Sequence, residues 1–176
     1  MVSPEDRVVH TPVLLQECLC HLSPEGEAYG EAPLLIDSTT GEGGHSDGFL
    51  NAYPRLQVLG LDADPTIQAR ARRRLARYGD RMDFWLGWFN DFYRDFDRAN
   101  GMGRPHLILF DLGISVFHYE ESGRGFSFRK EEPLDMRLSP SANLSAAEVV
   151  NTWSERQLAD LIYLYGEERY SRRIAA

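Results

Sequence analysis

The chain has 176 residues, enough for one domain or for one domain and part of a second. Its hydrophobic content of 43% and aromatic content of 11% are those of a globular protein and exclude a disordered chain, and no apolar run is long enough to span a membrane. The net charge of −8 argues against a nucleic-acid partner. The sequence starts without a secretory signal, and its two cysteines, Cys18 and Cys20, have a spacing that suits neither disulfides nor zinc. These two features indicate a cytoplasmic protein.

The first part of the chain alternates helical and strand patterns. Residues 13–22 have helical spacing, and residues 34–37 (LLID) predict a buried strand, followed by a glycine-rich turn and a short helix. A second strand is expected over residues 56–62 (LQVLGLD). The next helix is expected to begin at Pro65, because proline suits a first helical turn, and to bury an apolar stripe formed by Ile67, Ala71, Leu75 and Tyr78.

Further strands continue this alternation. We expect a third strand over residues 82–86 and a helix over residues 88–99. Residues 107–111 (LILFD) form an unbroken apolar run that ends in an acid, which is typical of a fully buried parallel strand. Alternation of this kind predicts βαβ units and therefore an α/β fold with a parallel sheet.

The pattern changes after Asp111. Residues 112–143 contain glycine and proline without a regular period and predict a long ordered loop. Two capping boxes then predict two helices, the first opened by Ser145 and the second by Ser154. A further helix is expected to start in the tail GEERYSRRIAA (residues 166–176).

The turn DSTTGEGGHS (residues 37–46) has the character of a cofactor loop. Gly41 and Gly43 match the first two glycines of the dinucleotide fingerprint G-x-G-x-x-G, and Ser46 stands where the third glycine belongs. Asp62 follows at the distance expected of an acid that binds ribose hydroxyls. The turn and the acid together indicate a cofactor that carries adenosine.

The charges of the turn favour one such cofactor. Asp37 and Glu42 are acids, and the sequence has no lysine or arginine between Asp37 and Ala52. A pyrophosphate would meet these carboxylates at close range, whereas S-adenosylmethionine has no phosphate and brings a sulfonium and an ammonium group. The turn therefore favours S-adenosylmethionine over a nicotinamide cofactor, although an NAD-dependent oxidoreductase and a turn without a ligand remain alternatives.

Other candidate residues lie at the expected strand ends. Asp64 is interpreted as a helix N-cap, and Phe89 either stacks on adenine or belongs to the core. Asp111 would face the crevice where α/β sheets bind ligands, and there it would hold the ligand or accept a hydrogen bond from an amine nucleophile. His45 is a ligand contact or a residue of the first helical turn. Because no second histidine or cysteine stands at metal-ligand spacing, we expect no metal.

Arginine supplies eighteen of the nineteen basic residues. Two readings of its clustering stay open, the solvated face of a helix and a local footprint for phosphate. The clusters comprise Arg70, Arg72, Arg73, Arg74, Arg77 and Arg81, and then Arg169, Arg172 and Arg173.

Eight segments in order carry a resemblance to a known family. They are HTPVLLQE (10–17), DSTTGEGGHS, LDADP (61–65), FDLGIS (110–115), SGRGFSF (122–128), PLDMR (133–137), AAEVVN (146–151) and YGEERYSRRIA (165–175). Together they closely resemble the bacterial MraW-type methyltransferases, which modify the exocyclic N4 of a cytosine in 16S ribosomal RNA of the small ribosomal subunit.

This resemblance implies a class I, Rossmann-like S-adenosylmethionine-dependent methyltransferase with a helical domain inserted after the fourth strand. It implies a cofactor-binding half over residues 1–115 and a linker loop with the start of the helical insert over residues 116–176. The implied contacts of S-adenosylmethionine are Gly43, Gly44, His45, Asp62, Phe89 and Asp111.

The sequence departs from the family pattern in two ways. His118 takes the place of a family glutamine that contacts the cofactor, and its ring can still donate a hydrogen bond. The family also continues well past the last matched segment, so this chain would supply only strands one to four and leave the fourth as an exposed apolar edge. The alternative function is therefore a truncated, non-catalytic homologue that binds the methyl donor or RNA.

Four residues of the long loop are candidates for contacting the RNA. A target cytosine must be unpaired or flipped out of a helix before it can react. Aromatic side chains could stack on such a base while arginines meet phosphate, and the alternative is that this segment is the packed hinge of the helical insert. The candidates are Arg124, Phe126, Phe128 and Arg137.

Overall fold

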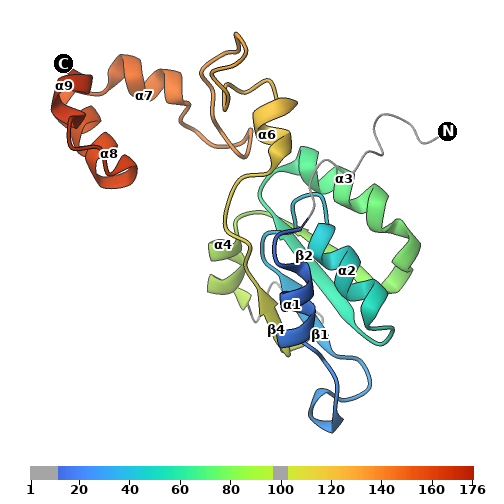
Figure 1. Ribbon diagram of the computed structural model, residues 1–176. Coiled ribbons are helices and arrows are strands. Elements are labelled where there is room, and N and C mark those ends of the chain that lie inside the picture. The colour runs from blue at the N-terminus through green and yellow to red at the C-terminus, as the bar shows by residue number, and fades with distance from the viewer. Residues whose placement is uncertain (1–11, 97–102) are drawn as a thin grey trace. The chain divides into compact units, whose positions relative to one another are not determined.

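A computed structural model describes residues 12–96 and 103–176 of the protein. The chain forms two compact units, Met1–Phe117 and His118–Ala176 (Figure 1). The sequence predicts the corresponding boundary after residue 115. No helix in the two described ranges is both long and apolar enough to cross a membrane.

The first unit is built on four parallel strands, as the sequence predicts. β1 occupies the centre, and the order across the sheet is β3-β2-β1-β4. This is the order of the first four strands in a doubly wound Rossmann sheet. The strands are β1 (Leu34–Asp37), β2 (Gln57–Asp62), β3 (Met82–Leu86) and β4 (Leu107–Leu109).

Helices follow the strands where the hydrophobic pattern predicts them. The first unit contains α1 (Leu15–His21), the 3₁₀ turn η2 (Glu27–Tyr29), α2 (Gly44–Ala52), α3 (Pro65–Leu75), the 3₁₀ segment η3 (Ala76–Arg81) and α4 (Phe89–Arg94). The helix expected over residues 88–99 thus begins one residue later, at Phe89, and α4 ends at Arg94, while residues 97–99 of that prediction lie outside the described ranges. α6 (Val116–Glu120), inside the predicted loop, spans the boundary between the units.

The second unit continues with three helices after the loop. They are α7 (Ala146–Thr152), α8 (Glu155–Gly166) and α9 (Ser171–Ala175). Ser145 and Ser154 each form both halves of a capping box, so the two predicted helix starts are confirmed.

Both faces of the central sheet are buried, which explains why its strands are continuous apolar runs. Leu35 and Val58 pack with Phe49 and Leu50 of α2 on one face. The strand residues that alternate with these point to the other face, where they form a second cluster with Phe92 of α4. They are Leu34, Ile36, Leu59 and Leu61. α2 and α4 therefore cover opposite faces of the sheet (Figure 1).

β4 departs from the predicted strand. It ends at Leu109 rather than at Asp111, and within the described sheet its outer edge has no neighbouring strand. Ile108 and Phe110 are 42% and 45% exposed. The apolar residues of this segment are therefore partly exposed at the open edge of the sheet and not fully buried.

The arginines of α3 and η3 make contacts within the unit. Arg74 and Arg77 pair with Asp47 at N–O distances of 3.2 and 2.5 Å. The Arg81 guanidinium donates hydrogen bonds to the carbonyls of Leu50 and Tyr53 at 3.1 and 3.2 Å. These contacts favour a structural role for the cluster over a phosphate footprint.

We expect Arg81→Ala to lower the free energy of unfolding by about 2 kcal/mol, because it removes a charged donor from carbonyls that end α2. Urea denaturation followed by circular dichroism measures this. Arg73→Ala, at an exposed position of α3, is the matched control and should change stability little. Equal effects of the two variants would contradict a structural role for Arg81.

Candidate functional site

The turn after β1 is bonded to the strands on both sides of it. The Ser38 N–H donates to the carbonyl of Leu109 in β4, and the Thr40 N–H donates to the carbonyl of Leu61 in β2, each at 2.9 Å. Since carboxyl ends of parallel strands meet at one edge of a sheet, the turn lies where α/β sheets bind ligands.

Asp62, at the end of β2, holds the turn directly. One carboxylate oxygen accepts the Gly41 N–H at 2.8 Å, and the other accepts the Asp64 N–H at 2.9 Å. Asp64 caps α3 through the Thr66 N–H, which confirms its interpretation as an N-cap. The two acids of this strand end therefore have separate tasks, one at the turn and one at the helix.

Asp111 and His45 lie together on the other side of the turn. The Asp111 N–H donates to Thr39 Oγ1 at 2.8 Å, and its carboxylate lies 3.7 Å from His45 Nδ1. His45 Nε2 lies 3.0 Å from the carbonyl oxygen of Val13, so the buried imidazole bridges the segment before α1 and Asp111.

The expectation that Asp111 ends a buried strand is wrong. Its side chain is 42% exposed because β4 stops two residues earlier. The carboxylate therefore needs no buried partner to offset desolvation, and it is accessible to a ligand.

Two glycines of the turn are required by packing. A Cβ atom at Gly43, where φ is +81°, would lie 2.7 Å from a methyl carbon of Leu75 in α3. A Cβ atom at Gly44 would lie 2.6 Å from the ring of Pro12. The backbone of the turn is thus pressed between α3 and the segment before α1, and only glycine fits there without displacement.

The two acids of the turn differ in what surrounds them. Glu42 pairs with Arg70 of α3 at 3.1 Å and is largely covered, so its charge is partly offset, and its role beside the cofactor stays a prediction. The sequence near the turn lacks a basic residue, but α3 brings one there in space. Two acids near the turn remain accessible to a cationic ligand, the partly exposed Asp62 and the exposed Asp111, whereas Asp37 is buried.

Asp37 is 1% exposed, and Ser46 Oγ donates to its carboxylate at 2.6 Å. Burial raises the pKa of Asp37 above its ordinary value of 3.8, and the hydrogen bond from Ser46 opposes this shift. In the sequence, Ser46 only marks the position where the dinucleotide fingerprint would have its third glycine. Its hydroxyl is instead the partner of the buried acid, and only the strand-to-helix geometry reveals it.

Phe89 begins α4, and its half-buried ring packs edge-to-face on Phe110 with centroids 5.4 Å apart. Nearby, the hydroxyl groups of Tyr93 and Ser38 lie 2.7 Å apart, which ties α4 to the turn. Phe89 therefore has core contacts, and its predicted stacking on adenine stays a prediction.

The remaining predicted residues belong to the second unit. His118 is buried in α6, with its ring edge-to-face against Phe126 at 5.3 Å. The guanidinium groups of Arg124 and Arg137 bond to loop carbonyls, whereas Phe128 is 99% exposed. The contact between His118 and the cofactor stays a prediction.

Two accessible carboxylates beside a glycine turn suit a ligand that carries positive charge. The donor set fits S-adenosylmethionine, because Asp62 could accept hydrogen bonds from hydroxyl groups and the exposed Asp111 carboxylate could face a cationic centre. Within the described ranges, no group of three or more histidine, cysteine, aspartate or glutamate side chains could hold a metal ion.

The sheet order and the turn together define the first unit as the first half of a Rossmann-like class I methyltransferase domain. The chain belongs to the MraW methylase family, whose model matches residues 7–176. The family resemblance seen in the eight sequence segments is thus confirmed.

Proteins named ribosomal RNA small subunit methyltransferase H are its relatives. The one from Treponema denticola is 54% identical over 168 residues, which cover 96% of this chain and 51% of that protein. The one from Treponema pallidum is 42% identical and covers 94% of this chain and 51% of that protein. The chain therefore spans about half the length of these curated relatives. Likeness to a solved structure is weaker, with a TM-score of 0.29 and 21% identity to the S-adenosylmethionine-dependent methyltransferase SibL, over 40% of this chain and 22% of that chain.

We expect Asp37→Asn to stabilise the first unit at neutral pH. Because the folded-state pKa of Asp37 is raised above 3.8, the stability of the wild-type chain falls as the pH rises through that pKa, and a neutral amide avoids this loss. Thermal unfolding at several pH values should show a higher Tm for the variant than for the wild type at pH 7, and this difference in Tm should shrink toward pH 3.8.

The exposed Asp80→Asn serves as the control and should show no such gap. A less stable Asp37→Asn variant at pH 7 would mean that the ionised carboxylate is net stabilising through Ser46.

Proposed function

We propose that the protein uses S-adenosylmethionine to methylate the exocyclic N4 of a cytosine in 16S ribosomal RNA. The observation that supports this most is that one glycine turn is bonded to both Asp62 and Asp111, which bracket the space at the carboxyl ends of β1, β2 and β4. Family membership and the names of the relatives agree with this reaction.

Asp62 is the residue that would bind the ribose hydroxyls of the donor. Its two oxygens already accept the N–H groups of Gly41 and Asp64, but each carboxylate oxygen has a second lone pair. The same contacts fix its orientation before the donor arrives. Phe89 would border the adenine.

Asp111 is the residue that would face the reacting amine. When bound, S-adenosylmethionine supplies a methyl group already activated by its sulfonium. The chain then has to align the two reactants and exclude water, and the exposed Asp111 carboxylate can accept a hydrogen from the amino nitrogen. Thr39 fixes the Asp111 backbone, and His45 holds the side chain from the other side.

A second candidate function is binding of the donor or of RNA without turnover. The observation behind it is that, within the described sheet, β4 is an edge strand beside which Ile108 and Phe110 are exposed. An NAD-dependent oxidoreductase gains no support from the family.

Donor binding tests the site assignment. We expect calorimetric titration of the chain with S-adenosylmethionine to show binding that Asp62→Ala abolishes, since this variant loses the hydroxyl acceptor and the brace of the turn. Asp64→Ser is the matched control, because serine also caps helices and should leave the affinity within about twofold. Unchanged affinity of Asp62→Ala would overturn the assignment.

Methyl transfer separates the two candidate functions. The chain is incubated with labelled S-adenosylmethionine and small ribosomal subunits, and the modified nucleoside is identified by mass spectrometry. N4-methylcytidine is the expected product, and Asp111→Ala should lower its rate at least a hundredfold, as expected for loss of a positioned acceptor. Donor binding without transfer would support the second candidate, and a different methylated nucleoside would overturn the first.

A further inference from the structure

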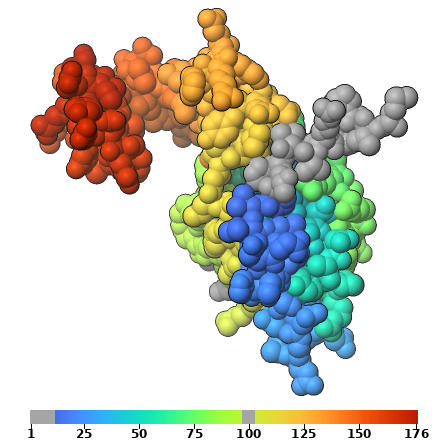
Figure 2. All heavy atoms as spheres, viewed as in Figure 1, coloured from blue at the N-terminus to red at the C-terminus, as the bar shows by residue number. Residues whose placement is uncertain are grey.

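We propose that the tip of the loop between α6 and α7, residues 127–130, binds an unpaired segment of RNA. In this surface Phe128 stacks on a base and Arg129 meets a phosphate. The inference rests on the proposed function and names the part of the second unit that contacts the RNA. The loop ends in a narrow tip that stands clear of the rest of its unit (Figure 2).

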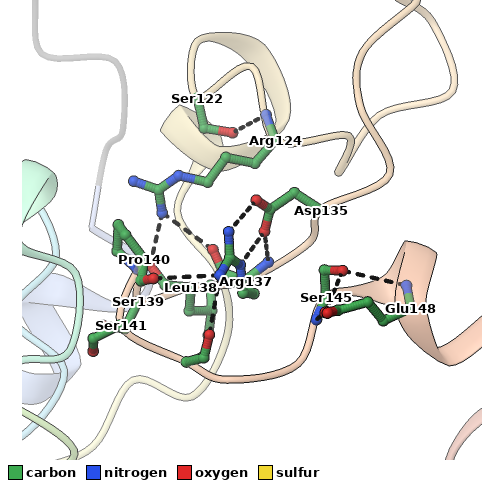
Figure 3. A network of polar contacts seen from close by, with 11 residues as sticks. Ser122, Arg124, Asp135, Arg137, Leu138, Ser139, Pro140, Ser141, Ser145 and Glu148 are labelled. Atoms are coloured by element: carbon green, nitrogen blue, oxygen red, sulfur yellow. Dashed lines mark hydrogen bonds and ion pairs between the residues drawn. The ribbon is translucent and has the colours of Figure 1, made fainter.

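The base of the loop is braced by two arginines. Arg124 Nη1 donates to the carbonyl of Leu138 at 2.7 Å (Figure 3). The Met136 N–H donates back to the carbonyl of Arg124 at 2.8 Å. Arg137 forms a two-pronged ion pair with Asp135, both N–O distances being 2.8 Å, which lowers the pKa of Asp135 to about 2. Arg124 and Arg137 therefore shape the loop rather than meet RNA.

The two limbs of the loop also meet nearer the tip. The Gly125 N–H donates to the Glu132 carboxylate at 2.9 Å, and a Cβ atom at Gly125 would lie 2.3 Å from the carbonyl oxygen of Pro133. Lys130 Nζ donates to the carbonyl of Glu120. The tip is thus held at both of its ends.

Phe128 lies in solvent at this tip. It is 99% exposed, whereas Phe126, two residues earlier, packs on His118. The contacts of Gly125 and Lys130 hold the chain on both sides of Phe128. Because the backbone is held there, less conformational freedom is lost when the ring stacks on a base.

The charges beside Phe128 favour RNA as the occupant. Arg129 is exposed, and Lys130 adds a second positive charge next to it. Glu131 is exposed and acidic, but Glu132 is turned inward by its bond to Gly125. An aromatic ring beside an arginine is the usual combination in proteins that bind single-stranded nucleic acid.

The test measures affinity of the whole chain for a fluorescein-labelled, cytosine-rich single-stranded RNA by fluorescence anisotropy. Phe128→Ala and Phe128→Leu should each weaken binding about tenfold, because both lose the flat ring. Phe128→Tyr should stay within about twofold of the wild type. Arg129→Gln should reduce the slope of log affinity against log salt concentration by about one, as expected for the loss of one phosphate contact.

Tyr165→Ala is the matched control, since Tyr165 is an aromatic residue 86% exposed on α8. It should leave RNA affinity unchanged. Full affinity of Phe128→Leu would overturn stacking and indicate an apolar protein surface as the occupant. Equal losses from Tyr165→Ala and Phe128→Ala, or no RNA binding by the wild-type chain, would also overturn the proposal.

Failure of this proposal can be told apart from failure of the proposed function. If wild-type methyl transfer stands while Phe128→Ala leaves both the RNA affinity and the KM for small subunits unchanged, only the loop proposal falls. If RNA binding depends on Phe128 but no methyl transfer occurs, only the proposed reaction falls.

Discussion

The site depends on one constraint, that the turn after β1 is bonded to every element around it. Its backbone reaches β4 through Ser38 and β2 through Thr40, and Gly41 donates to Asp62. Thr39 holds the backbone of Asp111. Acids that lie far apart in the sequence are therefore placed by contacts with one short segment. A displacement of the turn would alter several of them together, and Gly43 and Gly44 leave little room for added volume because Leu75 and Pro12 pack against them.

The buried carboxylate of Asp37 is the energetic cost of this arrangement. Its charge is disfavoured by burial, and the Ser46 hydroxyl, the nearby His45 and a backbone hydrogen bond from Thr39 compensate only in part. A core built for stability alone would place a neutral side chain at this position. The carboxylate instead accepts the Ser46 hydroxyl, so it ties the end of β1 to the first turn of α2 at the cost of burying an ionisable group.

Most of the fold could be predicted from the sequence, because its signals are local. The apolar runs of the strands, Pro65 at a first helical turn and the two serine caps each need only their neighbours in the chain. The partners of charged groups could not be predicted in this way. Glu42 meets Arg70, and Asp37 meets Ser46, only because α3 and α2 pack in particular orientations. The end of β4 also depends on its neighbours in the sheet, so an apolar run alone did not reveal that Asp111 is exposed.

The net charge of −8 is a poor guide to whether the chain can bind RNA, because it includes charges that lie outside the surface that RNA would contact. Several acids lie at the carboxyl edge of the sheet, where a cationic ligand suits them. Arg70 and Arg74 of α3 and Arg77 of η3 pair with Glu42 and Asp47, which offsets part of the positive charge on this side of the unit. What an RNA strand would meet is the local composition of an exposed segment, and within the described loop that segment has a solvated ring beside Arg129. A chain with a large negative charge can therefore bind a polyanion, provided that its acids are occupied elsewhere and its contact surface is small and rigid.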